Sequence, residues 1–171
     1  MVWSAVLLDR KCKRNRRGKK WDKAQLLLES AYLHLRKTKP PLQHPYAFLF
    51  AAIALDVYLP EDIVPLAVTM HPEHLQMQDE CTGRFPLSQA ASTTLLSRQR
   101  ADDLIALLLQ KYPTAVESVD FQGKSALHLA VASGKSWAAG VRRLVEANPD
   151  AIHWVAQSSG LSPALAAATS E

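Results

Sequence analysis

The stretch that decides the fold is FQGKSALHLAVAS, residues 121–133. Asp120 precedes it, and Gly123 stands ahead of a run rich in alanine and leucine. Because glycine readily adopts positive φ, we expect the chain to reverse direction at Gly123. The apolar residues that follow predict a short helix over 125–133. The alanine side chains of this helix are small, so a neighbouring element can approach closely.

The same order of features occurs three times. The stretches HPEHLQMQDECTGRFPLSQAAS (71–92) and NPDAIHWVAQSSGLSPALAAAT (148–169) align with YPTAVESVDFQGKSALHLAVAS (112–133). Each has a proline at the end of an amphipathic helix, an apolar residue three positions later, and then a glycine before an alanine-rich helix. The glycines are Gly83, Gly123 and Gly160, spaced by 40 and 37 residues. A unit of two short helices cannot bury its own apolar face, so we expect such units to stack.

The rest of the chain also has helical periodicity, and no alternating β-type run occurs. An all-α fold is therefore predicted. The helix over 21–37 has a charged face that suits it to cap the first repeat, whereas the segment 46–55 is apolar nearly all round and should be buried. Trp21 and Trp137 are assigned to the core. The predicted helices are 21–37, 46–55, 61–70, 85–92, 101–111, 125–133, 137–147 and 162–168.

The sequence SALHLA after Asp120 and Gly123 resembles the ankyrin repeat signature, in which an aspartate–glycine turn leads into Thr-Pro-Leu-His-x-Ala at the start of the first helix. GRFPLSQA (83–90) is similar but has Ser88 in the histidine place, and GLSPALAA (160–167) lacks the aspartate. The segment 46–69 resembles a divergent first repeat. The residues that stand at the signature positions of the best repeat are Ser125, Ala126, Leu127, His128 and Ala130.

This resemblance covers about residues 44–169 and implies a solenoid of stacked helix-turn-helix repeats with an additional N-terminal helix. We expect a basic arm over 1–20, a capping helix and linker over 21–40, and about four divergent repeats over 41–171, the last one incomplete. The repeat spacing is longer than the family's usual 33 residues. An insertion near 93–100 and extended turns would explain the difference.

Gly-Lys-Ser occurs at 123–125 and again at 134–136, and the same tripeptide ends many phosphate-binding loops. Such a loop needs a glycine five residues before its Gly-Lys, because backbone amides must curl around the phosphates. Those places hold Ser118 and Leu129, and no strand precedes either site. A nucleotide-hydrolysing enzyme is therefore disfavoured.

Two other groups of residues have catalytic or metal-binding chemistry. His71, His74 and Cys81, with Asp79 nearby, are possible metal ligands, but their spacing matches no zinc template and a structural role is favoured. Ser125 and His128 could form a hydrolase pair. The resemblance to ankyrin repeats implies, however, that these two positions form hydrogen bonds that tie adjacent turns and helices together. We predict no catalytic site, no cofactor and no metal, and hence no enzyme.

Ankyrin-like stacks recognise other proteins through their turn tips and the concave face of their first helices. The resemblance therefore implies a protein–protein interaction module, and the sequence does not identify the partner. Phe121 and Trp154 are either binding anchors or side chains packed against the next repeat, and packing is slightly favoured for Phe121. The candidate tip residues are Glu80, Thr82, Arg84, Phe121, Gln122, Lys124, Ser158 and Leu161.

The net charge of +4 conceals an asymmetry. Eight basic residues and Asp9 give residues 1–20 a net charge of +7, and twelve basic with fifteen acidic residues give the remainder −3. We expect the arm to be solvated coil. The arm is either a plain linker or a segment that contacts an import receptor, nucleic acid or anionic lipid. The alternative function is therefore that of a nuclear or nucleic-acid-associated adaptor. The basic residues are Arg10, Lys11, Lys13, Arg14, Arg16, Arg17, Lys19 and Lys20.

Composition places the chain among globular proteins. It is 48% hydrophobic and 21% charged, with a mean hydropathy of −0.08. The longest uncharged apolar run, 46–55, is about half of what a bilayer span requires, so no membrane span is expected. Cys12 and Cys81 suggest no disulfide framework. We therefore expect an intracellular protein, either cytoplasmic or nuclear.

Overall fold

The structure, a computed structural model, describes residues 47–56, 63–94 and 96–169. The basic arm, with its residues from Arg10 to Lys20, lies outside the described residues, as do the expected capping helix and its linker. The beginning of the first predicted repeat, 41–46, and the segment 57–62 between its two helices lie outside them too.

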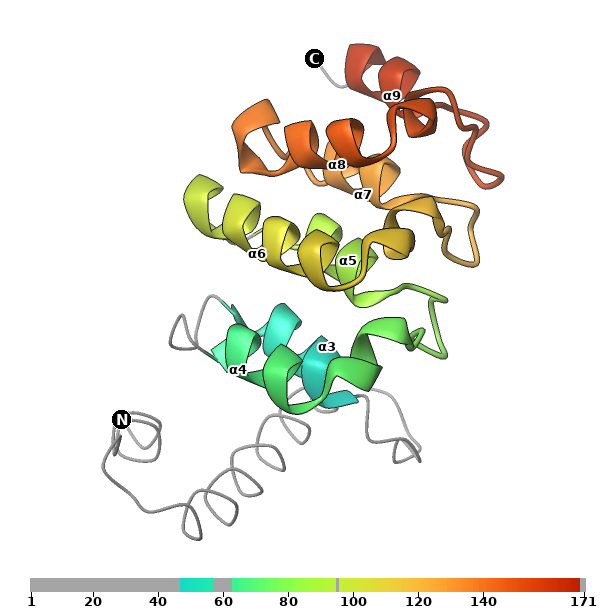
Figure 1. Ribbon diagram of the computed structural model, residues 1–171. Coiled ribbons are helices and arrows are strands. Elements are labelled where there is room, and N and C mark those ends of the chain that lie inside the picture. Colours follow the sequence, from blue (N-terminus) through green and yellow to red (C-terminus); the bar gives the residue numbers. More distant parts are fainter. Residues whose placement is uncertain (1–46, 57–62, 95, 170–171) are drawn as a thin grey trace, which may run out of the picture.

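The described residues form helices and turns, with a single isolated bridge between Val119 and Ser125 in place of any strand. The predicted all-α class is therefore confirmed for this part of the chain. No described helix is long and apolar enough to cross a bilayer. The α-helices are α3 (Ala47–Ala54), α4 (Ile63–Met70), α5 (Pro86–Ser92), α6 (Arg98–Lys111), α7 (Ala126–Ala132), α8 (Val141–Ala147) and α9 (Pro163–Thr169), as Figure 1 shows.

The helices lie in two layers. In the first layer α5 contacts both α3 and α7, and α7 contacts both α5 and α9. In the second layer α4 packs on α3, α6 on α5 and α8 on α7. The helix pairs are thus piled in chain order, with α9 at the end opposite α3 and α4 (Figure 1).

The core runs through both layers without interruption. Large buried side chains come from every described helix pair, among them Leu49 in α3, Leu87 in α5 and Leu144 in α8. Where neighbouring pairs meet, the residues are small, and Ala91 is fully buried. The hydroxyl of Ser133, just after α7, consequently reaches the carbonyl oxygen of Ala91 at 2.9 Å. Each helix pair therefore supplies the apolar wall that its neighbour lacks.

The repeated prolines begin short 3-10 helices and do not simply end the preceding helix. These are η2 (Pro72–Gln76), η3 (Pro113–Glu117) and η5 (Pro149–Ile152). Proline suits the first helical position because the N–H it lacks would have no partner there. The apolar residue three positions later is buried as Leu75 in η2 and Val116 in η3. These turns therefore anchor the chain before it leaves the core.

Helix α6 begins three residues earlier than the sequence pattern predicted. Ser97 caps it, since its hydroxyl accepts a hydrogen bond from the amide of Arg100 at 3.3 Å. Serine before a helical run is a regular N-cap signal. The insertion expected near 93–100 is therefore shorter, because residues 98–100 form the first turn of α6.

The single helix predicted over 137–147 is wrong. The structure has a 3-10 turn, η4 (Trp137–Ala139), followed by Gly140 at φ +103° and then α8. Gly140 is buried against Ile105, and a Cβ added to it would lie 2.4 Å from Ile105 Cδ1. The assignment of Trp137 to the core is wrong as well, because this break directs the Trp137 side chain outward and leaves it 58% exposed.

Two glycine substitutions test this break. Gly140→Ala should lower the free energy of unfolding by about 2–4 kcal/mol, since it combines a strained positive φ with a clash against Ile105. Gly134 has φ +69° and nothing within 4 Å of an added Cβ, so Gly134→Ala should lower it by only about 1 kcal/mol. Urea unfolding measures both, and equal losses would contradict close packing at Gly140.

Candidate interaction surface

Three turns of the same construction project between a 3-10 helix and the following α-helix. In the first, the amide of Asp79 donates to the carbonyl of Arg84 at 2.8 Å, and the amide of Gly83 donates to the carbonyl of Asp79 at 2.7 Å. Equivalent pairs of bonds close the turns at 120–124 and 156–161. The three glycines have φ between +66° and +74°, as their recurrence predicted. The middle turn is one residue shorter than the other two.

The turns are joined to one another by backbone hydrogen bonds. The amide of Phe121 donates to the carbonyl of Thr82 at 3.0 Å, and the amide of Ser158 donates to the carbonyl of Gln122 at 3.2 Å. Figure 1 shows the turns on one side of the stack, beyond the ends of the helices. The three turns therefore form one continuous row, which we call the turn row (79–84, 120–124 and 156–161).

A buried carboxylate fixes the middle of the turn row. The side chain of Asp120 is 1% exposed, and its Oδ1 accepts hydrogen bonds from the amides of Gln122 and Lys124, both at 2.9 Å. Its Oδ2 lies 3.3 Å from Nε of Arg84, in the preceding turn. Arg84, a predicted tip residue, thus links two turns. Thr82 is similarly engaged, because its hydroxyl donates to the carboxylate of Asp79 at 2.5 Å.

Ser125 and His128 form the N-terminal cap of α7. The hydroxyl of Ser125 accepts from the amide of His128, and Nδ1 of His128 accepts from the amide of Ser125 at 3.2 Å. The other ring nitrogen, Nε2, lies 3.3 Å from the carbonyl oxygen of Leu161 and donates to it, which fixes a neutral imidazole. Burial lowers the pKa of His128. The hydroxyl of Ser125 also lies 2.8 Å from Nδ1 of His128, and both side chains are buried. The hydrogen bonds expected at these two positions are therefore present.

The remaining tip residues differ in how much surface they present. Phe121 is 67% exposed, although its ring also covers Gly83, where an added Cβ would lie 2.4 Å from the ring. Glu80, Gln122 and Ser158 are exposed. Lys124 and Leu161 are half-buried, and Trp154 packs partly against the core. Phe121 therefore stabilises the preceding turn and still leaves most of its ring accessible.

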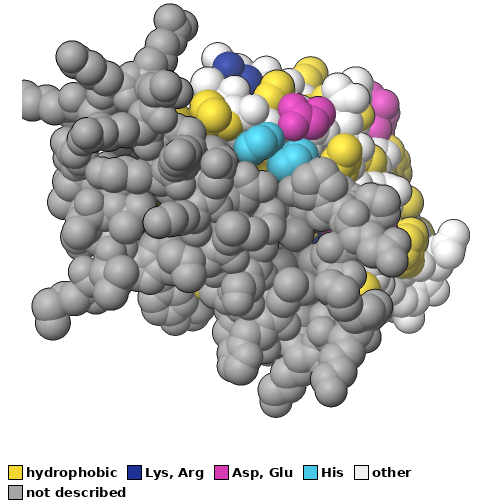
Figure 2. All heavy atoms as spheres, turned by 90° about the horizontal axis from the view of Figure 1, so that it is seen from below, with side chains coloured by type: hydrophobic (Ala, Val, Ile, Leu, Met, Phe, Trp, Pro, Cys, Tyr) yellow, Lys and Arg dark blue, Asp and Glu magenta, His cyan; other side chains and the backbone are white. Residues whose placement is uncertain are grey.

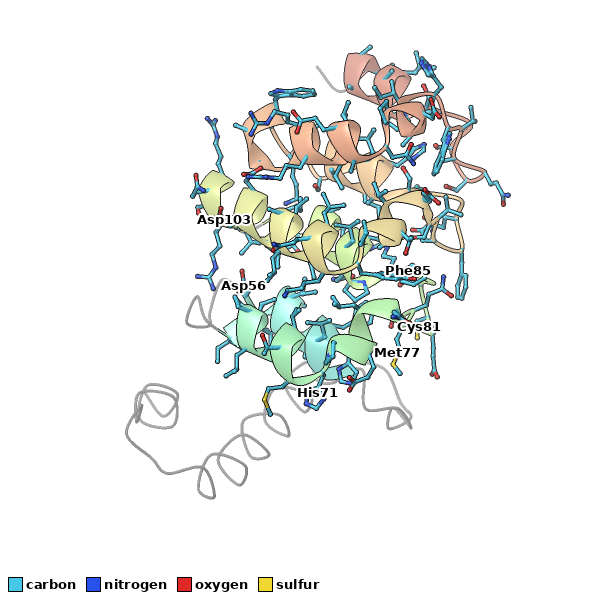
Figure 3. All side chains as sticks on the ribbon, in the orientation of Figure 1. Asp56, His71, Met77, Cys81, Phe85 and Asp103 are labelled. Carbon is cyan, nitrogen blue, oxygen red and sulfur yellow. The ribbon has the colours of Figure 1, made fainter. Side chains whose placement is uncertain are left out.

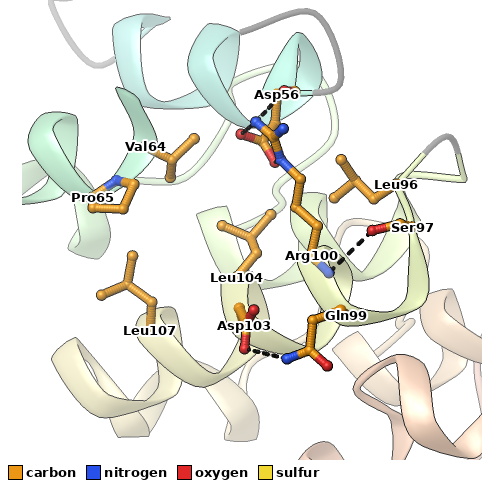
Figure 4. A pocket seen from close by; sticks show the side chains of 10 residues that line it. All are labelled: Asp56, Val64, Pro65, Leu96, Ser97, Gln99, Arg100, Asp103, Leu104 and Leu107. Carbon is orange, nitrogen blue, oxygen red and sulfur yellow. Dashed lines mark hydrogen bonds and ion pairs between the residues drawn. The ribbon is translucent and has the colours of Figure 1, made fainter. Parts of the chain in front are cut away.

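A second concave surface lies between α4 and α6. It has a volume of about 570 Å³. The apolar side chains of Val64, Leu104 and Leu107 form part of its wall, as Figure 4 shows. The guanidinium of Arg100 crosses it and donates to both carboxylate oxygens of Asp56, each at 2.8 Å. Sequence reasoning did not find this cleft, because it depends on the early start of α6 that places Arg100 opposite Asp56.

Further ion pairs and hydrogen bonds join consecutive helix pairs. Arg143 in α8 pairs with both oxygens of Asp102 in α6, at 2.8 and 2.6 Å. These hydrogen bonds raise the pKa of Arg143. The ammonium of Lys135 donates to the carbonyl of Thr93, and burial lowers the pKa of Lys135. The turn row therefore rests on a stack that is tied together along both layers.

At the opposite end of the stack from α9, two histidines and a glutamate lie together. Nδ1 of His71 is 3.2 Å from Oε1 of Glu73, and Nε2 of His74 is 3.7 Å from the same oxygen. The two imidazole rings are stacked, with centroids 4.7 Å apart. Figure 2 shows histidine and acidic side chains beside one another on this face, and Figure 3 places His71 below α4 with Cys81 away from it.

The protonation of this cluster follows from its surroundings. Burial lowers the pKa of His74, and a backbone hydrogen bond, aided by the histidines, lowers the pKa of Glu73. Glu73 is thus a carboxylate next to a neutral imidazole at neutral pH. Among the described residues these three could hold a metal. The sequence pattern indicated His71 and His74 as possible ligands together with Cys81 and Asp79. Cys81 and Asp79 do not belong to this group, whereas Glu73, which the pattern did not indicate, does.

Comparisons with models of known protein families, with curated proteins and with solved structures found no match for this chain. The function must therefore be argued from the residues and their arrangement.

The cap of α7 makes stability depend on pH. Because the folded-state pKa of His128 is lowered, the unfolded chain binds the proton first, and the free energy of unfolding should fall as the pH drops below about 6.5. His128→Gln should reduce this pH-dependent loss, as measured by urea unfolding at about pH 7 and about pH 5. The exposed His153, replaced by Gln, is the control and should leave the loss unchanged. An identical loss in the wild type and in His128→Gln would show that the cap tolerates protonation.

Proposed function

We propose that this chain is an ankyrin-like solenoid that serves as an intracellular protein–protein interaction module and has no catalytic activity of its own. The turn row is the observation that carries this proposal. Its three turns are joined by backbone hydrogen bonds, with a largely exposed Phe121 in the middle turn. A row that is already ordered loses little conformational entropy on binding, so more of the energy of its contacts contributes to affinity.

The local structure around the signature residues supports the ankyrin-like interpretation. A turn with a glycine at positive φ leads directly into an α-helix capped by Ser125 and His128. The same order occurs at Gly83 before α5 and at Gly160 before α9. First-layer helices that each contact the next are what stacking of such repeats requires.

The chemistry of the turn row favours a folded protein as the partner. One aromatic ring stands among exposed polar side chains, those of Glu80, Gln122 and Ser158. Interfaces between proteins commonly combine an aromatic anchor with a polar rim that forms hydrogen bonds. We therefore expect a partner surface with an apolar pocket for Phe121, flanked by hydrogen-bonding groups.

The alternative is a nuclear or nucleic-acid-associated adaptor that binds through residues 10–20. Eight basic residues within eleven support this alternative. Such binding would be largely electrostatic and would weaken steeply with added salt. The two functions make different demands on the chain, because only the first requires the turn row.

Removing the aromatic ring tests the proposed module. Phe121→Ala should weaken the affinity for partner proteins at least about tenfold, because truncating an aromatic anchor removes about 2 kcal/mol or more of binding energy. Partners are first captured with the full chain, and the affinity of each purified complex is then measured by calorimetry. Trp137→Ala is the matched control, since Trp137 is similarly exposed but follows the end of α7 away from the turn row.

The two variants and an arm deletion separate the possible outcomes. The proposed module requires loss with Phe121→Ala, retention with Trp137→Ala, and retention when residues 10–20 are deleted. Partners that disappear only on deletion of the arm, with affinity that falls steeply with salt, would identify the adaptor instead. Equal affinity of Phe121→Ala and the wild type for every partner would remove the turn row as a binding surface.

A further inference from the structure

The proline turn of the first repeat contains two histidines that its two sister turns lack. The segments HPEH (71–74), YPTA (112–115) and NPDA (148–151) begin η2, η3 and η5 in equivalent ways. His74 therefore corresponds to Ala115 and Ala151, and all three are buried. Since alanine meets the structural demand of this position twice, the fold does not require an imidazole there.

An imidazole at this position is unfavourable for folding by itself. His74 is 1% exposed, and its Nδ1 is buried without a hydrogen-bond partner in the part of the chain that the structure describes. A buried polar atom that forms no hydrogen bond destabilises the folded state. A histidine at a position where alanine would fit is explained if Nε2, the second ring nitrogen of His74, binds a ligand.

We propose that His71, Glu73 and His74 form a binding site for a divalent transition metal, with Zn²⁺ the best-fitting ion. Two imidazole nitrogens and one carboxylate oxygen are a zinc ligand set, whereas Ca²⁺ and Mg²⁺ prefer oxygen alone. The three ligand atoms lie within 4.8 Å of one another. Two of the separations, 3.2 and 3.7 Å, bracket the roughly 3.3 Å expected between ligands about 2.05 Å from a tetrahedral ion.

Binding requires a limited rearrangement. The two rings are nearly parallel, at 7°, and an ion must lie in the plane of each imidazole that binds it. One ring must therefore rotate out of the stack. His71 is suited to this because it is only half-buried, while the buried His74 stays in place. Glu73 is exposed, so the fourth coordination position opens towards solvent and can take water or a further ligand.

The sister turn supplies the variant that tests the site. The triple variant His71→Tyr, Glu73→Thr, His74→Ala installs the residues that η3 already carries at these positions. Calorimetric titration of the full chain with Zn²⁺ should show one equivalent bound, and the triple variant should bind it at least about 100-fold more weakly, since loss of ligands exceeds the roughly 10–100-fold effect of outer-shell changes. Co²⁺ should give the wild type the visible absorption of a tetrahedral site, and this absorption should be absent from the triple variant.

Control variants separate this site from adventitious binding. His153→Ala and Cys81→Ser remove an exposed imidazole and an exposed thiol outside the cluster, and both should leave the Zn²⁺ affinity unchanged. Glu73→Gln alters only an exposed side chain, so it tests the site even if the triple variant does not fold, and it should weaken binding at least about tenfold. Absence of a one-equivalent site in the wild type, or unchanged affinity in Glu73→Gln, would overturn the proposal.

Discussion

The whole structure depends on the shortness of its helices. Apart from α6, the described α-helices have seven or eight residues, about two turns each. Helices of this length are not stable alone in water, and a pair of them leaves apolar residues uncovered. Stacking in chain order solves both problems, because each first-layer helix is covered by the next. The buried alanines at these contacts follow from the same constraint, since larger side chains would hold neighbouring pairs apart.

Polar interactions set the register of the stack that apolar burial drives. Arginine–aspartate pairs join consecutive units at three places: Arg100 with Asp56, Arg84 with Asp120, and Arg143 with Asp102. Apolar burial is not directional, whereas a bidentate arginine–carboxylate contact or a backbone hydrogen bond between turns is. The turn row is a product of this register. The order of the turn row therefore comes from the same hydrogen bonds and ion pairs that fix the register of the stack.

Much of the helical part was predictable, and the failures have physical reasons. Proline, glycine and small residues recur at matching places, so the turns at Gly83, Gly123 and Gly160 and the helices that follow them could be predicted. The break at Gly140 could not, because a glycine inside an apolar pattern is compatible with a continuous helix and only packing against Ile105 distinguishes the two.

The candidate sites were predictable in proportion to how local they are. The capping bonds of Ser125 and His128 span three residues, and the pattern indicated them. The inward role of Arg84 depends on Asp120 in the next turn, 36 residues away, so the sequence offered Arg84 only as a tip residue. The cleft beside Arg100 and the grouping of Glu73 with two histidines likewise depend on backbone geometry that spacing alone does not reveal.

The most direct test of mutual support between neighbouring units is residue-resolved hydrogen exchange on Ala130→Leu. Ala130 is fully buried in α7, which contacts α5 on one side and α9 on the other. An oversized side chain there should separate the units and destabilise the protein by about 1–3 kcal/mol. If stacking is the source of stability, amide protection falls in α5 as well as in α7. A loss of protection confined to α7 would contradict it.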